Sequence, residues 1–327
     1  MEPRTLQQAI LYFADYANCH KAVTEIRWPD GVVKCPTCGS EKVTYMASVR
    51  RWKCYGKHPK AQFSLKVGTI FEDSAVGLEK WLPALWMLTN CRNGISSYEL
   101  GRALGVTQKT AWFMLSRLRL ALQESDGDWL KGHIEADETF IGGKARFMHK
   151  ERRDRVTGKG KRGPSGKVAV MGLLERTSAH RASRVRTTVV PRIRRWNLQT
   201  EIRRHIPQDG QSTLYTDALK SYVQPKWPGM GRDRYIHKVI DHAEAYVNGV
   251  VHTNGMENYW SLLKRMLKGT YISVEPFHLF RYLDEQAFRF NNRKANDAMR
   301  FFDGLKGVLG KRLTYVALTG SELPQTC

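Results

Sequence analysis

The chain has 327 residues, with 53 Lys and Arg against 31 Asp and Glu, and a net charge of +22. This excess of positive charge favours a polyanionic partner, and nucleic acid fits it better than a membrane surface. Hydrophobic residues make up 42% of the chain, which excludes a wholly disordered protein, and the length predicts two or three domains. No apolar run approaches the roughly 20 residues that span a bilayer, and no signal-peptide core opens the chain, so we expect a cytoplasmic protein.

Cysteine spacing indicates a metal site near the N-terminus. Cys35 and Cys38 lie in a tight knuckle, and Cys54 follows after a strand-like segment. Together with His58 they provide four soft or borderline donors, the set that tetrahedral Zn²⁺ prefers. The spacing therefore predicts a zinc ribbon, in which two knuckles meet across a hairpin.

The fourth zinc ligand stays open on spacing alone. His58 is further from Cys54 than the two cysteines of the first knuckle are from each other, so Cys19 or His20 can take its place. Thiols without a metal are the other interpretation. A ribbon this small hardly folds without its metal, and we therefore predict structural Zn²⁺.

A helix-turn-helix is predicted over residues 96–122. Leu100 and Ala103 are expected to pack inward, Gly105 to take the turn and the next helix to begin with Thr107 as its cap. Two packed helices that do not bind DNA are the alternative. The second helix offers five side chains to a major groove or its phosphates, which are Gln108, Lys109, Thr110, Ser116 and Arg117.

An acidic segment at residues 133–143 interrupts this basic chain. Alternation places Glu135, Asp137 and Thr139 on one side of a strand, and two glycines then supply a turn. The alternative is a solvated edge strand whose acids balance nearby Lys and Arg. The basic loop at residues 144–167 that follows is predicted to contact a phosphate backbone, or else to be a solvated loop.

A second acid lies at the end of a later strand. After strands expected at residues 168–175 and 184–190, residues 213–217 read as a strand that ends in Asp217. Open α/β sheets place their active groups at the carboxyl ends of central strands. The alternative for Asp217 is the cap of a following short helix.

A third acid lies on a predicted amphipathic helix at residues 252–268. Glu257 falls on the same face as Lys264 and Lys268. The alternative is a capping box, with Asn254 as the N-cap and Glu257 at the third helical position.

The three acids suggest one shared chemistry. Mg²⁺ is a hard ion that proteins hold with a few carboxylates, leaving other positions to water and phosphate oxygens. Two such ions about 4 Å apart activate an attacking oxygen and stabilise a leaving oxygen in phosphodiester chemistry. Asp137, Asp217 and Glu257 are therefore candidates to converge on a Mg²⁺ site.

Several motifs together carry a resemblance to a known family. They are CPTCGS, VGTIFEDS, the helix-turn-helix, EADETFIGG, LYTDALKSY, HTNGMENYWSLLKR and YLDEQAFRFNNR. Over roughly residues 10–295 the chain resembles a DDE-type transposase of a bacterial insertion sequence. The branch it resembles joins a zinc ribbon and a helix-turn-helix to an RNase H-like catalytic domain.

The resemblance implies site residues. Asp137, Asp217 and Glu257 would be the catalytic triad and the Mg²⁺ ligands. Some relatives carry Asn at the third position, so the adjacent Asn258 is the alternative third residue. Three basic side chains on the same helix would contact DNA, namely Lys264, Arg265 and Lys268.

The resemblance also implies the reaction and the partners. The protein would bind the terminal inverted repeats of its own element, cleave DNA with water at two Mg²⁺ ions, with Mn²⁺ as a substitute, and join the ends to target DNA. Because two DNA ends are held together, a homodimer or higher oligomer on DNA is expected. A nucleoid-associated cytoplasmic location, without membrane contact, follows from this activity.

The expected architecture is a multi-domain α/β (α+β) protein whose RNase H-like mixed sheet is flanked by helices. Its parts are an N-terminal helix and zinc ribbon (residues 1–75), a helix-turn-helix domain (76–125), a catalytic domain (126–300) and a C-terminal tail (301–327). Two other functions are compatible with these elements. One is a zinc-ribbon and helix-turn-helix DNA-binding regulator, and the other is an RNase H-like nuclease that cuts without joining.

Overall fold

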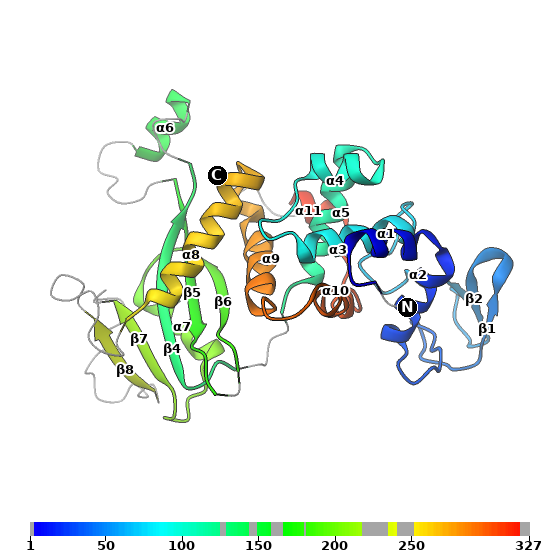
Figure 1. The fold of residues 1–327 in the computed structure, drawn as a ribbon, viewed down its shortest axis with the longest axis horizontal. Coiled ribbons are helices and arrows are strands. Elements are labelled where there is room, and N and C mark those ends of the chain that lie inside the picture. Colours follow the sequence, from blue (N-terminus) through cyan, green and yellow to red (C-terminus); the bar gives the residue numbers. More distant parts are fainter. Residues whose placement is uncertain are drawn as a thin grey trace. The chain divides into compact units, whose positions relative to one another are not determined.

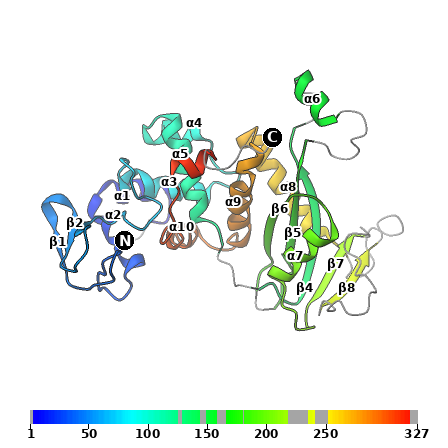
Figure 2. The same cartoon turned by 180° about the vertical axis from the view of Figure 1, so that it is seen from behind.

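The structure is a computed structural model that describes residues 3–124, 129–143, 149–157, 166–179, 181–217, 235–240 and 252–320. The chain divides into two compact units, which Figures 1 and 2 show from opposite sides. The first, here called the N-terminal unit, is built from Met1–Gln123 and Ala295–Cys327, and the second, the sheet unit, from Glu124–Lys294. None of the helices in the described ranges combines the length and the apolar character that a bilayer crossing needs.

The N-terminal unit combines a small antiparallel sheet with a group of helices. The sheet has the order β1-β2-β3, and β2 pairs with both neighbours. Its strands are β1 (Val43–Met46), β2 (Arg51–Cys54) and β3 (Gln62–Phe63), with the short helix η1 (Ala47–Val49) between the first two. The helices are α1 (Leu6–Ala14), α2 (Tyr16–Arg27), α3 (Leu78–Asn90), α4 (Ser97–Leu104), α5 (Gln108–Ala121), α10 (Asp297–Lys306) and α11 (Tyr315–Thr319).

Both ends of the chain build the core of the N-terminal unit. The fully buried Phe301 of α10 packs its ring against Phe13 of α1 and Trp86 of α3, with centroids 5.3 Å apart in each pair. The residues described between 301 and 320 therefore form part of a packed unit rather than a tail. Their partners lie more than 200 residues earlier, so no local pattern reveals this role.

The sheet unit is a five-stranded mixed sheet with the order β6-β5-β4-β7-β8. β5 runs antiparallel to both of its neighbours, β4 and β6, whereas β4, β7 and β8 run parallel to one another. This is the mixed sheet with flanking helices that the sequence predicts, so the predicted fold class is confirmed. The strands are β4 (His133–Ile141), β5 (Val168–Glu175), β6 (Arg184–Val190), β7 (Thr213–Asp217) and β8 (Ile236–Ile240).

Helices cover both faces of this sheet (Figures 1 and 2). Leu198 and Ile202 of α7 pack with Ile134 and Ala136 of β4 on one face, whereas the apolar side of α8 packs with β5 on the other. The acidic strand β4 is consequently a central strand and not a solvated edge. The helices described in the sheet unit are α6 (Lys150–Thr157), α7 (Arg195–His205), α8 (Asn254–Met266), the π-helical η4 (Leu267–Tyr271), η5 (Pro276–His278) and α9 (Leu279–Asn291).

A glycine lets α8 lie close to the sheet. A Cβ on Gly172 of β5 would stand 2.2 Å from Met256 Cε and 2.7 Å from the Trp260 ring. Such distances are far inside van der Waals contact, so a side chain there would push α8 away. The close approach brings the first turns of α8 over β4 and β5.

Candidate functional site

Asp137 lies in the middle of β4 and points to the face that α8 covers. Its Oδ2 accepts a hydrogen bond from Trp260 Nε1 at 2.9 Å. Burial raises the pKa of Asp137 above its ordinary value, and the negative charges of Asp217 and Glu257 raise it further. A carboxylate in this position is therefore destabilised unless a cation lies beside it.

Asp217 ends β7, which pairs in parallel with β4. Thr216 lies opposite Ala136 in the register, so Asp217 and Asp137 are the next residues on the two neighbouring strands. The short helix expected after Asp217 falls outside the described residues, and its capping alternative stays a prediction.

Glu257 is exposed in the first turn of α8. The helix begins at Asn254 with Thr253 as its N-cap, and no side chain of the cap forms a hydrogen bond. The capping box expected from Asn254 and Glu257 is therefore absent, because the helix begins one residue earlier than that box requires. The adjacent Asn258 is exposed as well.

The structure thus places the three predicted acids close enough for the charges of Asp217 and Glu257 to act on Asp137. The three carboxylates are not drawn together as closely as metal ligands are. Among the described residues, the Cys and His cluster of the zinc ribbon is the group whose ligand atoms all lie within 4.8 Å of one another. Like charges repel, and a hard divalent ion would offset that repulsion. An all-carboxylate donor set of this kind fits Mg²⁺ in chemistry.

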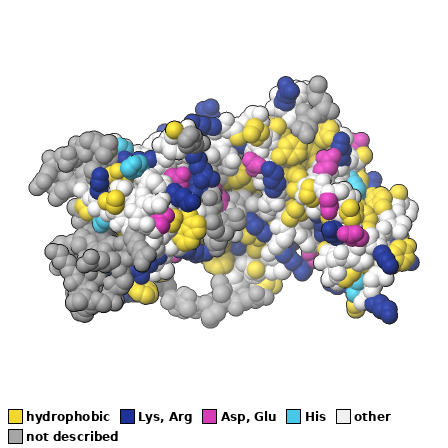
Figure 3. Space-filling model, turned by 90° about the horizontal axis from the view of Figure 1, so that it is seen from below, with side chains coloured by type: hydrophobic (Ala, Val, Ile, Leu, Met, Phe, Trp, Pro, Cys, Tyr) yellow, Lys and Arg dark blue, Asp and Glu magenta, His cyan; other side chains and the backbone are white. Residues whose placement is uncertain are grey.

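The basic side chains predicted to contact DNA on this helix are accessible. Lys264 is half-buried in the last turn of α8, and Arg265 beside it is exposed. Lys268 is exposed in the π-helical segment η4, which follows α8 without a break. Dark-blue Lys and Arg side chains are spread over the face of the molecule seen in Figure 3.

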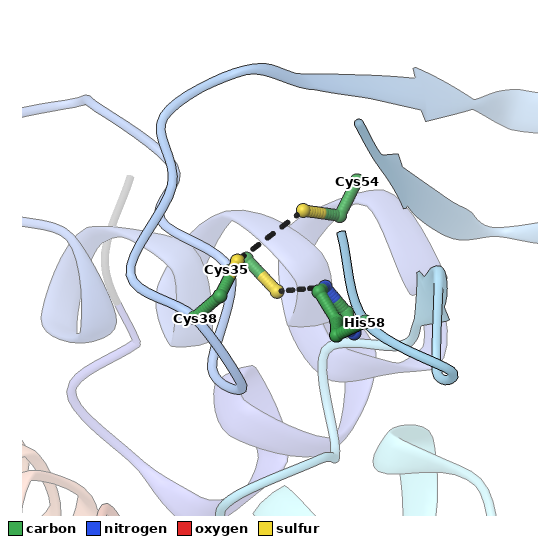
Figure 4. Close-up of side chains that lie close together, drawn as sticks. All are labelled: Cys35, Cys38, Cys54 and His58. Carbon is green, nitrogen blue, oxygen red and sulfur yellow. Dashed lines mark hydrogen bonds between the residues drawn. The ribbon is translucent and has the colours of Figure 1, made fainter. Parts of the chain in front are cut away.

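The predicted zinc ligands lie together in the N-terminal unit (Figure 4). The ligand atoms of Cys35, Cys38, Cys54 and His58 are all within 4.8 Å of one another. Cys35 Sγ lies 3.4 Å from His58 Nε2, and Cys38 Sγ lies 3.6 Å from Cys54 Sγ. Three thiols and one imidazole around a common centre form a donor set for tetrahedral Zn²⁺.

The surroundings of the cluster also suit a metal. Burial raises the pKa of the Cys35 thiol, but hydrogen bonds from the backbone of Cys38 and Thr37 and from the neighbouring thiols together lower that pKa to about 7, which favours the thiolate that binds metal. A Cβ on Gly56 would stand 2.9 Å from Cys38 Sγ and 3.3 Å from Cys54 Sγ. The glycine therefore leaves the space around the sulfurs open.

The two alternative ligands point elsewhere. The buried Cys19 donates its thiol to the Phe13 carbonyl at 3.1 Å, and burial raises its pKa to about 12. His20 stacks on Trp52, with ring centroids 5.2 Å apart. The geometry therefore favours His58 as the fourth ligand.

Helices α4 and α5 form the predicted helix-turn-helix. Gly105 takes the left-handed conformation with φ of 60°, and Thr107 caps α5 by accepting from the Thr110 amide at 3.2 Å. Ala103 is exposed, contrary to expectation. Gly101 is buried instead, because the turn passes so close that a Cβ there would stand 3.0 Å from the Val106 carbonyl.

Two of the predicted DNA contacts on α5 are wrong. Ser116 and Arg117 are each only 4% exposed. Ser116 donates to the Trp112 carbonyl at 2.9 Å. Arg117 holds the N-terminal unit together by donating to three backbone carbonyls, at 2.6–3.1 Å, which belong to Ile70, Glu72 and Leu313.

The three residues predicted to contact DNA from the first turn of α5 are at least partly exposed. Lys109 is exposed, whereas Gln108 and Thr110 are half-buried. Gln108 donates to Ser97 Oγ at 2.9 Å, and the Thr110 hydroxyl lies 2.9 Å from that of Thr107. Only the start of α5 therefore remains available to DNA among the residues predicted on that helix.

Sequence reasoning missed one residue that touches the acidic site. The ring of Trp260 lies on the buried side of α8, and the residue is 4% exposed. Its indole N–H nevertheless donates to Asp137. The signal available was that a buried Trp needs an acceptor for that N–H.

Comparison with known proteins identifies the class. Residues 129–291 match the ISXO2-like transposase domain, and residues 15–56 match the transposase zinc-ribbon domain. An uncharacterized protein in the transposable element ISH50 of Halobacterium salinarum is 29% identical over 78% of this chain and 84% of its own length. The chain belongs to the insertion-sequence transposases that carry a zinc ribbon and an ISXO2-like transposase domain, which confirms the predicted family.

Proposed function

We propose that this transposase binds the terminal inverted repeats of its own insertion sequence and carries out Mg²⁺-dependent DNA cleavage and strand transfer. Asp137, Asp217 and Glu257 would hold the metal. The observation that carries the proposal is that Asp137 and Asp217 are neighbours on two parallel strands and that α8, which carries Glu257, covers Asp137 through Trp260, within a chain that has a transposase domain. A strand carboxylate whose ionisation is opposed by burial and by two other acids fits a cation site better than a structural role.

Two Mg²⁺ ions, when bound, would supply Lewis acidity to the attacking and leaving oxygens of the phosphodiester. The protein's own residues would orient the metal ligands and bind the DNA. The Trp260 indole fixes Asp137 in one orientation, and Lys264, Arg265 and Lys268 would contact the DNA backbone along the same helix. No side chain has to form a covalent intermediate with DNA.

DNA recognition would be divided between the two units. In the N-terminal unit, Gln108, Lys109 and Thr110 at the start of α5 would approach a groove of the inverted repeat. The Cys35, Cys38, Cys54 and His58 cluster would hold Zn²⁺ as a structural ion, because its four side chains fit that metal in type and spacing. Since two DNA ends must be joined, the working form would be at least a dimer on DNA.

A supercoiled plasmid that carries both element ends, incubated with the protein and Mg²⁺, tests the proposal. We expect cut ends and products in which those ends are joined to other DNA. Cuts without joined products would instead indicate a nuclease. Binding of the ends without any cut would indicate a DNA-binding regulator, and either result would overturn the proposed function.

A further inference from the structure

Arg176 directly follows β5 and contacts β4, β7 and the residue that leads into α8, which are the segments that carry the proposed Mg²⁺ ligands. Its Nε donates to Glu135 Oε1 in β4 at 2.7 Å. Its guanidinium lies over the Tyr215 ring of β7, with Cζ 4.2 Å from the ring centroid. Its Nη2 donates to the carbonyl of His252, just before α8, at 2.6 Å. One side chain therefore links β4, β7 and the start of α8.

Glu135 of β4 also contacts α8 directly. Its side chain is 1% exposed, and its Oε2 accepts from the Met256 amide at 2.9 Å. The Thr253 side chain does not cap α8, so Glu135 satisfies an amide at the helix start and places negative charge at the positive end of the helix dipole. The contact needs Gly255, where a Cβ would stand 2.8 Å from Glu135 Oε2.

Each of these contacts lies close in sequence to a proposed ligand. Glu135 precedes Asp137 by two positions on the same strand face. Tyr215 lies opposite Glu135 in the register and precedes Asp217 by two. The amide that Glu135 binds in α8 immediately precedes Glu257. One guanidinium and one buried carboxylate therefore join the three backbone segments that carry the acids.

We propose that Arg176, acting through Glu135, is a positioning residue that holds the three acids at the spacing that the Mg²⁺ site needs. The inference rests on the proposed function and adds a residue that touches neither the metal nor the DNA. Lys cannot replace Arg here, because a single ammonium lacks both the planar fork and the stacking surface that the contacts use.

A second buried pair in the same sheet offers a matched control. Arg184 Nε donates to Glu175 Oε2 at 3.1 Å, and both residues are buried, at 7% and 6% exposed. Arg184 also donates to the Trp129 carbonyl. This pair joins β5 to β6, neither of which carries a proposed ligand, so Arg184→Lys reports what weakening a buried pair costs by itself.

The experiment compares the full-length wild type, Arg176→Lys, Glu135→Gln and Arg184→Lys. Mn²⁺ binding is measured by the rise in melting temperature on titration, and the Mn²⁺ concentration for half-maximal cleavage of an element-end duplex is measured in parallel. Asp137→Asn identifies the part of the thermal response that belongs to the acidic site. Glu135→Gln is the second variant in case Arg176→Lys does not fold, because Gln keeps an oxygen for the Met256 amide.

We expect Arg176→Lys and Glu135→Gln to need roughly tenfold more Mn²⁺ in both measurements, the effect typical of groups that orient metal ligands, with end binding unchanged. Arg184→Lys should lower the melting temperature without this shift. The positioning role is overturned if the two variants bind Mn²⁺ like the wild type, or if Arg184→Lys shifts Mn²⁺ binding equally. A wild type that binds Mn²⁺ at Asp137 but neither cuts nor joins DNA would contradict the proposed function without contradicting the positioning role.

Discussion

Asp137 combines three features that a purely structural residue would not keep. It is half-buried, its pKa is raised by burial and by two nearby acids, and it receives a hydrogen bond from Trp260. An acid whose pKa is raised in the folded state reduces stability as pH rises through that pKa, because ionisation is easier in the unfolded chain. At neutral pH and without metal, the charge on Asp137 therefore opposes folding.

Asp137→Asn is consequently expected to stabilise the metal-free protein. Asn keeps an oxygen for the Trp260 N–H and removes the buried charge. A gain of about 1 kcal/mol corresponds to a rise of about 2–4 °C in melting temperature for a unit of this size. Thermal unfolding in EDTA at pH 7 measures it, and a lower melting temperature than that of the wild type would contradict the account. Added Mg²⁺ should stabilise the wild type and not the variant.

Arg117 and Lys109 on α5 are expected to behave in opposite ways. Arg117→Ala leaves the carbonyls of Ile70, Glu72 and Leu313 without their donor, so we expect a loss of about 2–4 kcal/mol in stability. Lys109→Ala removes an exposed charge and should weaken binding of the element ends while the melting temperature stays unchanged. Unfolding and end binding measured on both variants check this, and an Arg117→Ala protein with wild-type stability would contradict it.

At the scale of elements, the zinc ribbon depends on the space that Gly56 leaves beside the cysteine sulfurs as well as on the ligands themselves. Gly56→Ala places a methyl group 2.9 Å from Cys38 Sγ, and we expect it to lower zinc affinity. A matched control is Gly39→Ala, where the added Cβ meets no atom within 4 Å but the backbone φ of 71° is unfavourable for Ala. Zinc content after dialysis against a chelator measures both, with stoichiometric zinc expected in the wild type. Equal zinc retention by Gly56→Ala and the wild type would show that this space is unimportant.

The elements that could be predicted from the sequence are those with a strong local pattern. The alternation around Asp137 predicted β4, the apolar stripe predicted α8, and the Gly105 turn with the Thr107 cap predicted the start of α5. The predicted contacts of Ser116 and Arg117 failed because helical spacing shows which face a residue occupies and not what covers that face. Arg117 donates to the carbonyl of Leu313. This partner lies almost 200 positions later in the sequence, where helical spacing cannot reveal it.

The proposed ligands of the acidic site could be named from the sequence, whereas the residues that support them could not. Alternation along a strand, the end of a strand and the start of a helix are visible in sequence, so Asp137, Asp217 and Glu257 could be named as candidates. Arg176 could not, because its contacts to Glu135, Tyr215 and His252 join segments up to 76 positions away. Such a role depends on the order and register of strands, which periodicity does not determine.

At the scale of the whole molecule, the chain leaves the N-terminal unit at Gln123, builds the sheet unit, and returns to the first unit at Ala295. The N-terminal unit is therefore completed by the last segment of the chain. Phe301 supplies a fully buried ring between α1 and α3, and removing it would leave Phe13 and Trp86 without that contact.

A chain that stops at Lys294 is accordingly expected to lose the fold of its N-terminal unit and keep that of its sheet unit. Limited proteolysis with mass mapping should show protection within residues 124–294 and cleavage within residues 1–123. The isolated segment 124–294 should give a cooperative unfolding transition. If the shortened chain protects residues 1–123 as well as the full chain does, the role assigned to α10 is wrong.

The central claim is that Asp137, Asp217 and Glu257 act as one metal site. The most direct measurement is strand transfer of pre-cut element ends in Mg²⁺ by Asp137→Asn, Asp217→Asn, Glu257→Gln and Asn258→Ala, with end binding measured on the same preparations. The account predicts that each of the first three variants binds the ends but does not join them, while Asn258→Ala still joins them. Joining by Glu257→Gln together with loss of joining in Asn258→Ala would contradict the assignment of the third ligand, and joining by Asp137→Asn or Asp217→Asn would contradict the site itself.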